Sequence, residues 1–173
     1  MADEMADRPL LRAFRFRITL RRSPDAVEGA QPSEDLPTGT ELGNGSFQEC
    51  TGLEIEMDVQ NYQEGGRNDG VIQRVGRAKY QNIVLKRGMF FGDPRKVNTD
   101  LWQWMQDVVS GVRPVARYDG VIEVMSVGFN VAATWVFERG LPARIRGPEL
   151  NAKTGEVAIE ELHIAHEGLR LVV

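Results

Sequence analysis

Two histidines stand three residues apart near the end of the chain, at His163 and His166, and such a pair could bind a metal ion. Side chains at this spacing share one face of a helix but point to opposite faces of a strand. The flanking residues alternate between apolar and polar, as they do in a strand. Structural zinc needs about four ligands, and Cys50 is the only thiol. We therefore expect structural roles for both histidines and no metal site.

Neighbouring carboxylates, Glu160 with Glu161 and Glu54 with Glu56, could act as an acid and base pair. A glycosidase needs two carboxyl groups that face each other across a cleft. Glu54, Glu56 and Asp58 instead recur on the polar side of an alternating pattern, which predicts a solvated strand face. The sequence contains no serine-nucleophile motif, zinc-protease motif or phosphate-binding loop. We therefore expect no enzymatic activity and no cofactor.

Composition limits the partners of the chain. Its 173 residues carry a net charge of −4, so no overall basic field attracts nucleic acid. No apolar run reaches the roughly 18 residues that a membrane span needs, so we expect no membrane insertion. The N-terminal residues 1–7 are acidic and lack an apolar core, so we expect no signal peptide, and residues 1–9 are expected to form a flexible tail. The length predicts one domain over 1–173, and the lone cysteine fits synthesis in a reducing cytoplasm.

Strands are the elements expected to position most of these side chains. Apolar residues alternate with three arginines and Thr19 over residues 14–21, and with three acidic residues and Gln60 over 53–60. A period of two indicates a strand with one apolar face and one charged face. Further strand patterns occur at 79–87, 115–118, 120–127, 129–138 and 156–166.

One helix is expected over about residues 98–110. Asn98 can cap its start, and Gly111 can end it. Apolar side chains recur at helical spacing at Leu101, Trp102, Met105, Val108 and Val109. We expect Trp102 to pack into the core. Trp104 points to a different face, where it is either an interface anchor or an incidental surface residue.

Two long loops interrupt the strand patterns. Residues 23–46 form an inserted loop with three prolines, five acidic residues and no basic residue, which predicts exposure to solvent. Residues 63–76 contain four glycines and predict a long hairpin-like excursion, in which Gly65 and Gly66 can adopt a tight turn. Many strands with one helix predict a mainly β fold, a β-sandwich or small barrel whose helix covers one opening.

Short motifs follow one another in a fixed order along the chain. They are F-Q-E-C-T-G-L at 47–53, Y-Q-E-G-G at 62–66, N-I-V-L-K-R-G at 82–88, G-P-E-L-N-A at 147–152, V-A-I-E-E-L at 157–162 and H-E-G-L at 166–169. In this order they resemble the inner tube proteins of contractile phage tails and of related injection systems. The resemblance covers roughly residues 12–20 and 47–172.

The resemblance implies a tail-tube-like fold that assembles into a hexameric ring. Strands of all the subunits would form one continuous barrel around a lumen, and stacked rings would form a tube. The excursion would reach a neighbouring subunit or the next ring. The residues predicted at subunit or ring interfaces are Tyr62, Glu64, Gly65, Gly66, Arg67 and Trp104.

The same resemblance implies a set of partners and a location. The partners are other copies of the chain, a sheath protein, baseplate and tube-terminator proteins, and cargo in the lumen. Assembly in the cytoplasm would be followed by incorporation into a phage tail or a tail-like particle that can be released from the cell. The acidic loop at 23–46 would lie on the outer surface and contact the sheath.

A basic strand face includes Arg15 and Arg17. Proteins that bind single strands usually interleave aromatic residues with basic ones, but Phe14 and Phe16 lie on the opposite face of this strand. Two interpretations remain open. The arginines either pair with an acidic strand, within the protomer or between subunits, or they form a charged stripe that faces the lumen. The acidic strand face consists of Glu54, Glu56 and Asp58.

The chain departs from the family pattern at two places. The loop at 23–46 is long, and Gly140-Leu141-Pro142 stands where an Ala-Trp-Pro-like segment is usual. A specialised tube-initiating or tube-capping paralogue is therefore an alternative to the bulk tube subunit. A monomeric module that binds through the loop at 23–46 is a further alternative. A hydrolytic tail component is disfavoured because no catalytic constellation is present.

Overall fold

The computed structural model describes residues 10–24, 36–42, 46–63, 65–66, 70–93, 95–126, 128–153 and 155–172. The expected flexible tail at 1–9 and most of the loop at 23–46 lie outside the described residues. So do two of the expected interface residues, Glu64 and Arg67.

Strands account for most of the described chain, and one helix accompanies them, which confirms the mainly β expectation. The strands are β1 Phe16–Arg22, β2 Phe47–Thr51, β3 Ile55–Tyr62, β4 Ile72–Tyr80, β5 Ile83–Gly88, β6 Phe91–Asp93, β7 Lys96–Val97, β8 Tyr118–Met125, β9 Val131–Arg146, β10 Ile159–Ala165 and β11 Gly168–Val172. The helix, α1, spans Asp100–Val109. Within the described ranges, no helix has the length and apolar character needed to cross a membrane.

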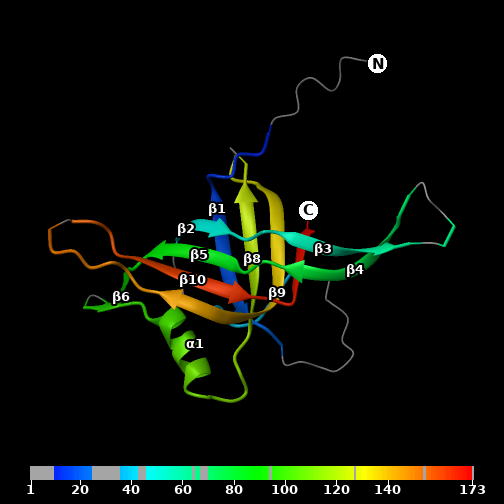
Figure 1. The fold of residues 1–173 in the computed structure, drawn as a ribbon. Helices are drawn as coiled ribbons and strands as arrows, with labels where there is room; N and C mark the ends of the chain where they lie inside the picture. Colours follow the sequence, from blue (N-terminus) through cyan, green and yellow to red (C-terminus); the bar gives the residue numbers. More distant parts are fainter. Residues whose placement is uncertain are drawn as a thin grey trace.

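The long strand β9 joins two antiparallel sheets. Its first part pairs with β8 on one side and β11 on the other, and β1 pairs with β8. Its last part pairs with β10, followed by β5 and β2. The two groups of strands cross at a steep angle in Figure 1. This arrangement is a sandwich whose layers share one bent strand.

β9 changes sheets at a corner around Arg139 and Gly140. Arg139 adopts a positive φ of 54°, and its backbone N–H donates to the buried Asp119 carboxylate at 2.7 Å. The Ser23 hydroxyl donates to the same carboxylate oxygen at 2.6 Å. A side chain at Gly140 would lie 2.6 Å from the backbone oxygen of Tyr118. The strand expected at 129–138 therefore continues past the corner, because this corner bends the backbone without ending it.

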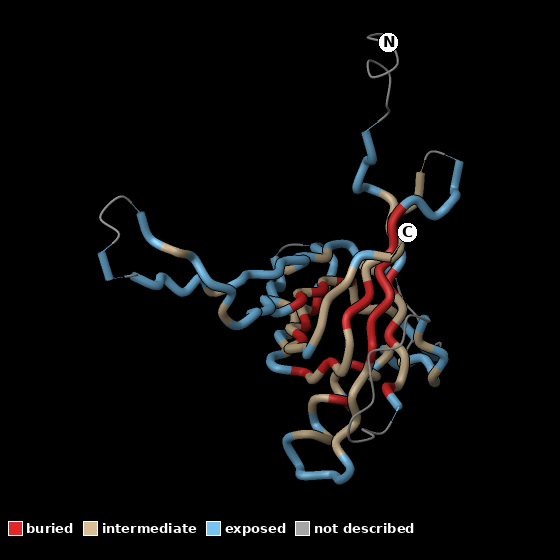
Figure 2. Tube along the Cα trace, turned by 90° about the vertical axis from the view of Figure 1, so that its right-hand side faces the viewer, coloured by how far each residue is buried: buried red, intermediate tan, exposed pale blue. Residues whose placement is uncertain are grey.

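The core lies between the two sheets and under α1 (Figure 2). Phe137 packs directly over Gly120, where a Cβ atom would lie 2.0 Å from the ring. The buried members of the core are Ile18, Leu20, Ile83, Leu85, Leu101, Trp104, Ile122, Phe137, Leu162 and Ile164.

A buried ion pair ties β5, β10 and the start of α1 together. Arg87 and Glu160 are each only 2% exposed, and Nε of Arg87 donates to Oε1 of Glu160 at 2.5 Å. The other Glu160 oxygen accepts the indole N–H of Trp102 at 2.9 Å. Arg87 also donates to the side-chain oxygen of Asn98 at 3.0 Å. Buried charges are tolerated when they are paired and hydrogen-bonded in this way.

The helix buries a different face from the expected one. Trp104 is 2% exposed, its indole N–H donates to the backbone oxygen of Ala116 at 2.9 Å, and its ring packs on Tyr118. The expected exposure of Trp104 is therefore wrong, and it cannot act as a surface anchor. Trp102 is half-buried and Val109 is exposed. Positions 101, 104 and 108 satisfy helical spacing as well as 102, 105 and 109 do, so periodicity could not distinguish the two faces.

Several element boundaries also differ. The strand expected at 79–87 belongs to two strands, because β4 ends at Tyr80 and β5 begins at Ile83. Most of β4 lies inside the excursion expected at 63–76. Thr99, rather than Asn98, is the formal cap of α1, although the Asn98 side chain accepts the N–H of Asp100 at 3.3 Å.

The buried ion pair yields a stability prediction. Glu160→Leu should lower the free energy of unfolding by about 3–5 kcal/mol, because it leaves Arg87 charged and unpaired in the interior. The double variant Arg87→Met/Glu160→Leu should recover much of that loss, since no buried charge remains. Urea unfolding followed by circular dichroism measures both.

A matched control is Glu149→Leu, which removes the exposed partner of Arg146. Exposed pairs contribute about 0–1 kcal/mol, so this variant should unfold close to wild type. A loss for Glu160→Leu no larger than that of Glu149→Leu would contradict the assigned role of the buried pair.

Candidate functional site

Strands β3 and β4 form a two-stranded ribbon, here called the arm, that extends from the body of the protein (Figures 1 and 2). In the described chain the arm pairs with no other strand. Its register runs from Ile55 opposite Tyr80 to Tyr62 opposite Ile72. An isolated ribbon of this kind is only marginally stable in water, so the arm is suited to pairing with something else.

One face of the arm is apolar and uncovered. Ile55, Met57 and Val59 alternate along β3 and lie opposite Tyr80, Ala78 and Val75 on β4. Val59 is 57% exposed and Val75 is 81% exposed. The alternation at 53–60 therefore marks a strand, but none of the described residues covers its apolar side. Large exposed apolar patches mark interaction sites, so this face is the strongest candidate for a functional surface.

The opposite face of the arm is charged and largely neutralised within the ribbon. Lys79 lies opposite Glu56 and bonds to the Asp58 carboxylate at 2.7 Å. The hydrogen bond to Asp58 raises the pKa of Lys79. Arg74 stacks on the ring of Tyr62, with its guanidinium carbon 4.0 Å from the ring centroid. Asp58 thus finds a basic partner on β4.

The tip of the arm contains Gly65 and Gly66. Gly66 has a positive φ of 93°, whereas Gly65 is not in that region. A Cβ atom at either glycine would meet nothing within 4 Å. Of these two positions, only 66 has a backbone conformation that favours glycine. The interface roles of Tyr62, Gly65 and Gly66 remain predictions.

The root of the arm is held by close packing. Gly52 has a φ of 89°, and a Cβ atom there would lie 2.0 Å from the backbone oxygen of Asn82. The ring of His166 lies between Tyr80 and Phe137, at centroid distances of 5.3 and 5.6 Å. Nε2 of His166 is 3.0 Å from the backbone oxygen of Gln81. His166 therefore attaches the end of β4 to the core.

The other histidine has a separate environment. Nε2 of His163 lies 2.6 Å from the Glu161 carboxylate, and this hydrogen bond lowers the pKa of Glu161. The two rings thus contact different groups. His163 lies on β10, whereas His166 follows the end of that strand at Ala165. Within the described ranges, no cluster of three or more His, Cys, Asp or Glu side chains is arranged to hold a metal ion.

The arginines of β1 lie away from the arm. Arg17 forms an ion pair with Glu123 of β8, its direct cross-strand partner, at 3.2 Å. The guanidinium of Arg15 lies over the ring of Phe129, 4.6 Å from its centroid. Arg17 therefore pairs with an acidic residue within the protomer, but that residue belongs to β8 and not to the strand at 53–60.

Cys50 offers no reactive nucleophile. It lies on β2 opposite Leu85, and burial raises the pKa of its thiol to about 12. Because the thiolate is the nucleophilic form, this cysteine stays protonated and inert near neutral pH.

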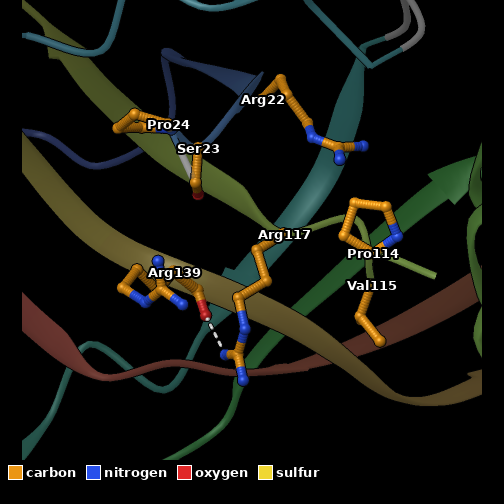
Figure 3. A pocket seen from close by; sticks show the side chains of 7 residues that line it. All are labelled: Arg22, Ser23, Pro24, Pro114, Val115, Arg117 and Arg139. Carbon is orange, nitrogen blue, oxygen red and sulfur yellow. Dashed lines mark hydrogen bonds between the residues drawn. The ribbon is translucent and has the colours of Figure 1, made fainter. Parts of the chain in front are cut away.

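A cavity of about 370 Å³ opens near the corner of β9 (Figure 3). Arg117 and Arg139 both bind the carboxylate of Glu167, at 3.0 and 2.9 Å, and Arg117 also donates to the backbone oxygen of Arg139. The Ser23 hydroxyl donates to Asp119. The charged groups at this cavity mainly hold the corner together. The lining residues are Arg22, Ser23, Pro24, Pro114, Val115, Arg117 and Arg139.

Comparisons with known proteins agree with this geometry. The family model described as T4-like virus tail tube protein gp19 matches residues 12–170. A search of curated proteins finds no match to the chain.

Solved structures share the fold. A chain of the anti-feeding prophage tube terminating cap aligns with a TM-score of 0.73 at 20% identity, covering 99% of this chain and 96% of that one. A chain of the anti-feeding prophage baseplate gives 0.70 at 20% identity, covering 96% and 97%. A chain of the sheath–tube complex of the PVC extracellular contractile injection system gives 0.69 at 17% identity, covering 99% and 97%.

The root of the arm yields a second prediction. A left-handed conformation costs an alanine roughly 1–2 kcal/mol. Gly52→Ala should lower the free energy of unfolding by more than this, because the added methyl group also collides with the backbone of Asn82. Gly66→Ala is the matched control, since its φ is similar but its surroundings are open. Chemical unfolding of both variants measures the difference. Equal losses would show that the close approach at Gly52 does not matter.

Proposed function

Because this chain belongs to the T4-like virus tail tube protein family, we propose that it is a structural subunit of the inner tube of a contractile phage tail or a related injection system. The family match extends over most of the chain, and the fold is that of tube components of such systems. The observation that supports assembly most directly is the uncovered apolar face of the arm. A protein that acted alone would leave this face in water.

We infer that the subunits close into a hexameric ring and that the rings stack around a lumen. Within the described residues, four strands have a free edge: the arm strands β3 and β4, and also β2 and β11. Free edges are a liability unless another chain covers them. A head-to-tail contact that closes on itself forms a ring and covers such edges. The edge of β1 is already partly covered, because Thr40 and Leu42 bond to it within the chain.

The partners follow from the same assignment. The similar solved structures are described as a sheath–tube complex, a baseplate and a tube terminating cap. We infer that this chain contacts the corresponding sheath, baseplate and terminator proteins, and that cargo passes through the lumen. The acidic loop at 23–46 is proposed to contact the sheath. The finished particle would be a phage tail or a tail-like device assembled in the cytoplasm and then released.

A structural role without catalysis is part of this proposal. The family is one of tube proteins, and the chemistry-bearing residues form structural contacts: Cys50 is a protonated buried thiol, and Glu160 belongs to the buried ion pair. These contacts support a scaffold more than an active site.

A specialised subunit at the tube end is the second candidate. It is favoured by the likeness to the tube terminating cap and by the Gly140-Leu141-Pro142 segment at the corner of β9. A bulk subunit should form tubes of many rings, whereas an end subunit should stop at one ring. A monomeric binding module is less well supported, because it provides no cover for the arm.

Assembly is tested by electron microscopy and light scattering of the purified chain. Wild type should form rings or tubes as concentration rises. Val59→Asp should abolish them and leave the circular dichroism spectrum unchanged, because a carboxylate on the apolar face opposes burial. Gln60→Asp, the next residue on the opposite face of the arm, should assemble like wild type. A wild-type mass that stays near that of one chain at all concentrations would refute the proposed function.

A further inference from the structure

A second exposed apolar patch, here called the receiving patch, lies on the body of the protein. It comprises Phe91 of β6, Val97 of β7, and Val157 and Ile159 at the start of β10. Phe91 is 71% exposed and Val157 is 73% exposed. Side chains of this size on the surface of a protein that assembles are candidates for a contact.

The two segments that carry the receiving patch lie next to each other although they are far apart in sequence. Phe91 pairs directly with Val97, and Ile159 pairs with Gly88. The backbone N–H of Met89 donates to the oxygen of Ala158 at 2.8 Å, and Val157 lies against Gly88. The segment that leads into β10 therefore meets the chain at Gly88 and Met89, just before β6.

The receiving patch and the arm lie on different sides of the protein. In Figure 1 the arm extends on one side, and β6 and the segment that leads into β10 lie on the other. A heterologous contact requires two different surfaces on one subunit, so that each copy can give one and receive the other. This placement fits that requirement.

Charges beside the two surfaces are complementary. Arg95 lies in the turn between β6 and β7, and Lys96 begins β7 opposite Asp93. The described part of the chain shows no side-chain ion pair for either. Glu54 lies just before the arm and Glu56 lies near its start, opposite Lys79. Neither forms an ion pair among the described residues, since Lys79 bonds to Asp58. Opposite charges at the rim of an interface favour the correct pairing of surfaces.

We propose that the receiving patch binds the arm of an adjacent copy of this chain. The apolar face of the arm, including Ile55, Met57, Val59 and Val75, covers the patch. This inference rests on the proposed function, since it requires that the chain assembles. It adds which surface of the neighbour receives the arm.

Cross-linking of assembled tubes tests the contact. Cys50→Ala removes the only native thiol, and Val59→Cys with Val157→Cys places one thiol on the arm and one in the patch. A flexible bismaleimide is used because it does not demand the narrow geometry of a disulfide. The matched control pairs Val59→Cys with Val109→Cys, at the exposed end of α1. Denaturing gels should show a ladder of covalent oligomers for the first pair of variants. The control pair should show no such ladder.

A second measurement avoids dependence on one double variant. Single variants Val59→Cys and Val157→Cys, each in the Cys50→Ala background, are mixed, assembled with the Cys50→Ala protein and cross-linked. Covalent dimers that require both single variants support the contact. Tubes without these dimers, or with equal cross-linking to Val109→Cys, would overturn the receiving patch and leave the tube assignment intact. Absence of any wild-type assembly would instead refute the proposed function and this inference with it.

Discussion

The pairing register of β5 with β10 is the constraint on which the rest of the fold depends. It places Arg87 opposite Glu160 and Lys86 opposite Glu161. Because neighbouring residues of a strand point to opposite faces, the first pair lies in the core and the second lies on the surface, where Lys86 also bonds to Glu49 of β2 at 3.0 Å. A slip of one residue would bury Lys86 and expose Arg87. The buried pair also bonds to Asn98 and Trp102, so the same register positions α1.

The arm follows the opposite physical logic. The body encloses its apolar residues between two sheets, but the arm exposes them on one face and neutralises charges on the other. Gly52 and His166 hold its root against the core. The free energy that would normally come from burying the arm within the chain is thus left for contact with another molecule. This division explains why a folded protomer can be both stable and committed to assembly.

Several short motifs acquire a physical meaning in the structure. The L-K-R-G and A-I-E-E-L segments supply the inner pair Arg87–Glu160 and the outer pair Lys86–Glu161 of one strand register. The T-G-L segment contains the glycine that passes close to Asn82, and the H-E-G segment contains the histidine that packs at the root of the arm. Glu167 of the same segment binds Arg117 and Arg139 at the corner of β9. The motifs thus belong to elements that lie far apart in sequence but meet around one core.

The sequence by itself determined the mainly β class, the single helix near 98–110, the alternation of the arm and the family, because periodicity and motif order are local properties of the chain. It did not determine which face of α1 is buried, since Trp102 and Trp104 satisfy helical spacing equally well. It also could not show that β9 passes through the corner at Gly140, or that Arg17 pairs with Glu123. Those outcomes depend on which strands become neighbours. The tertiary structure decided them, because contacts between distant segments form only when the two sheets close around the core.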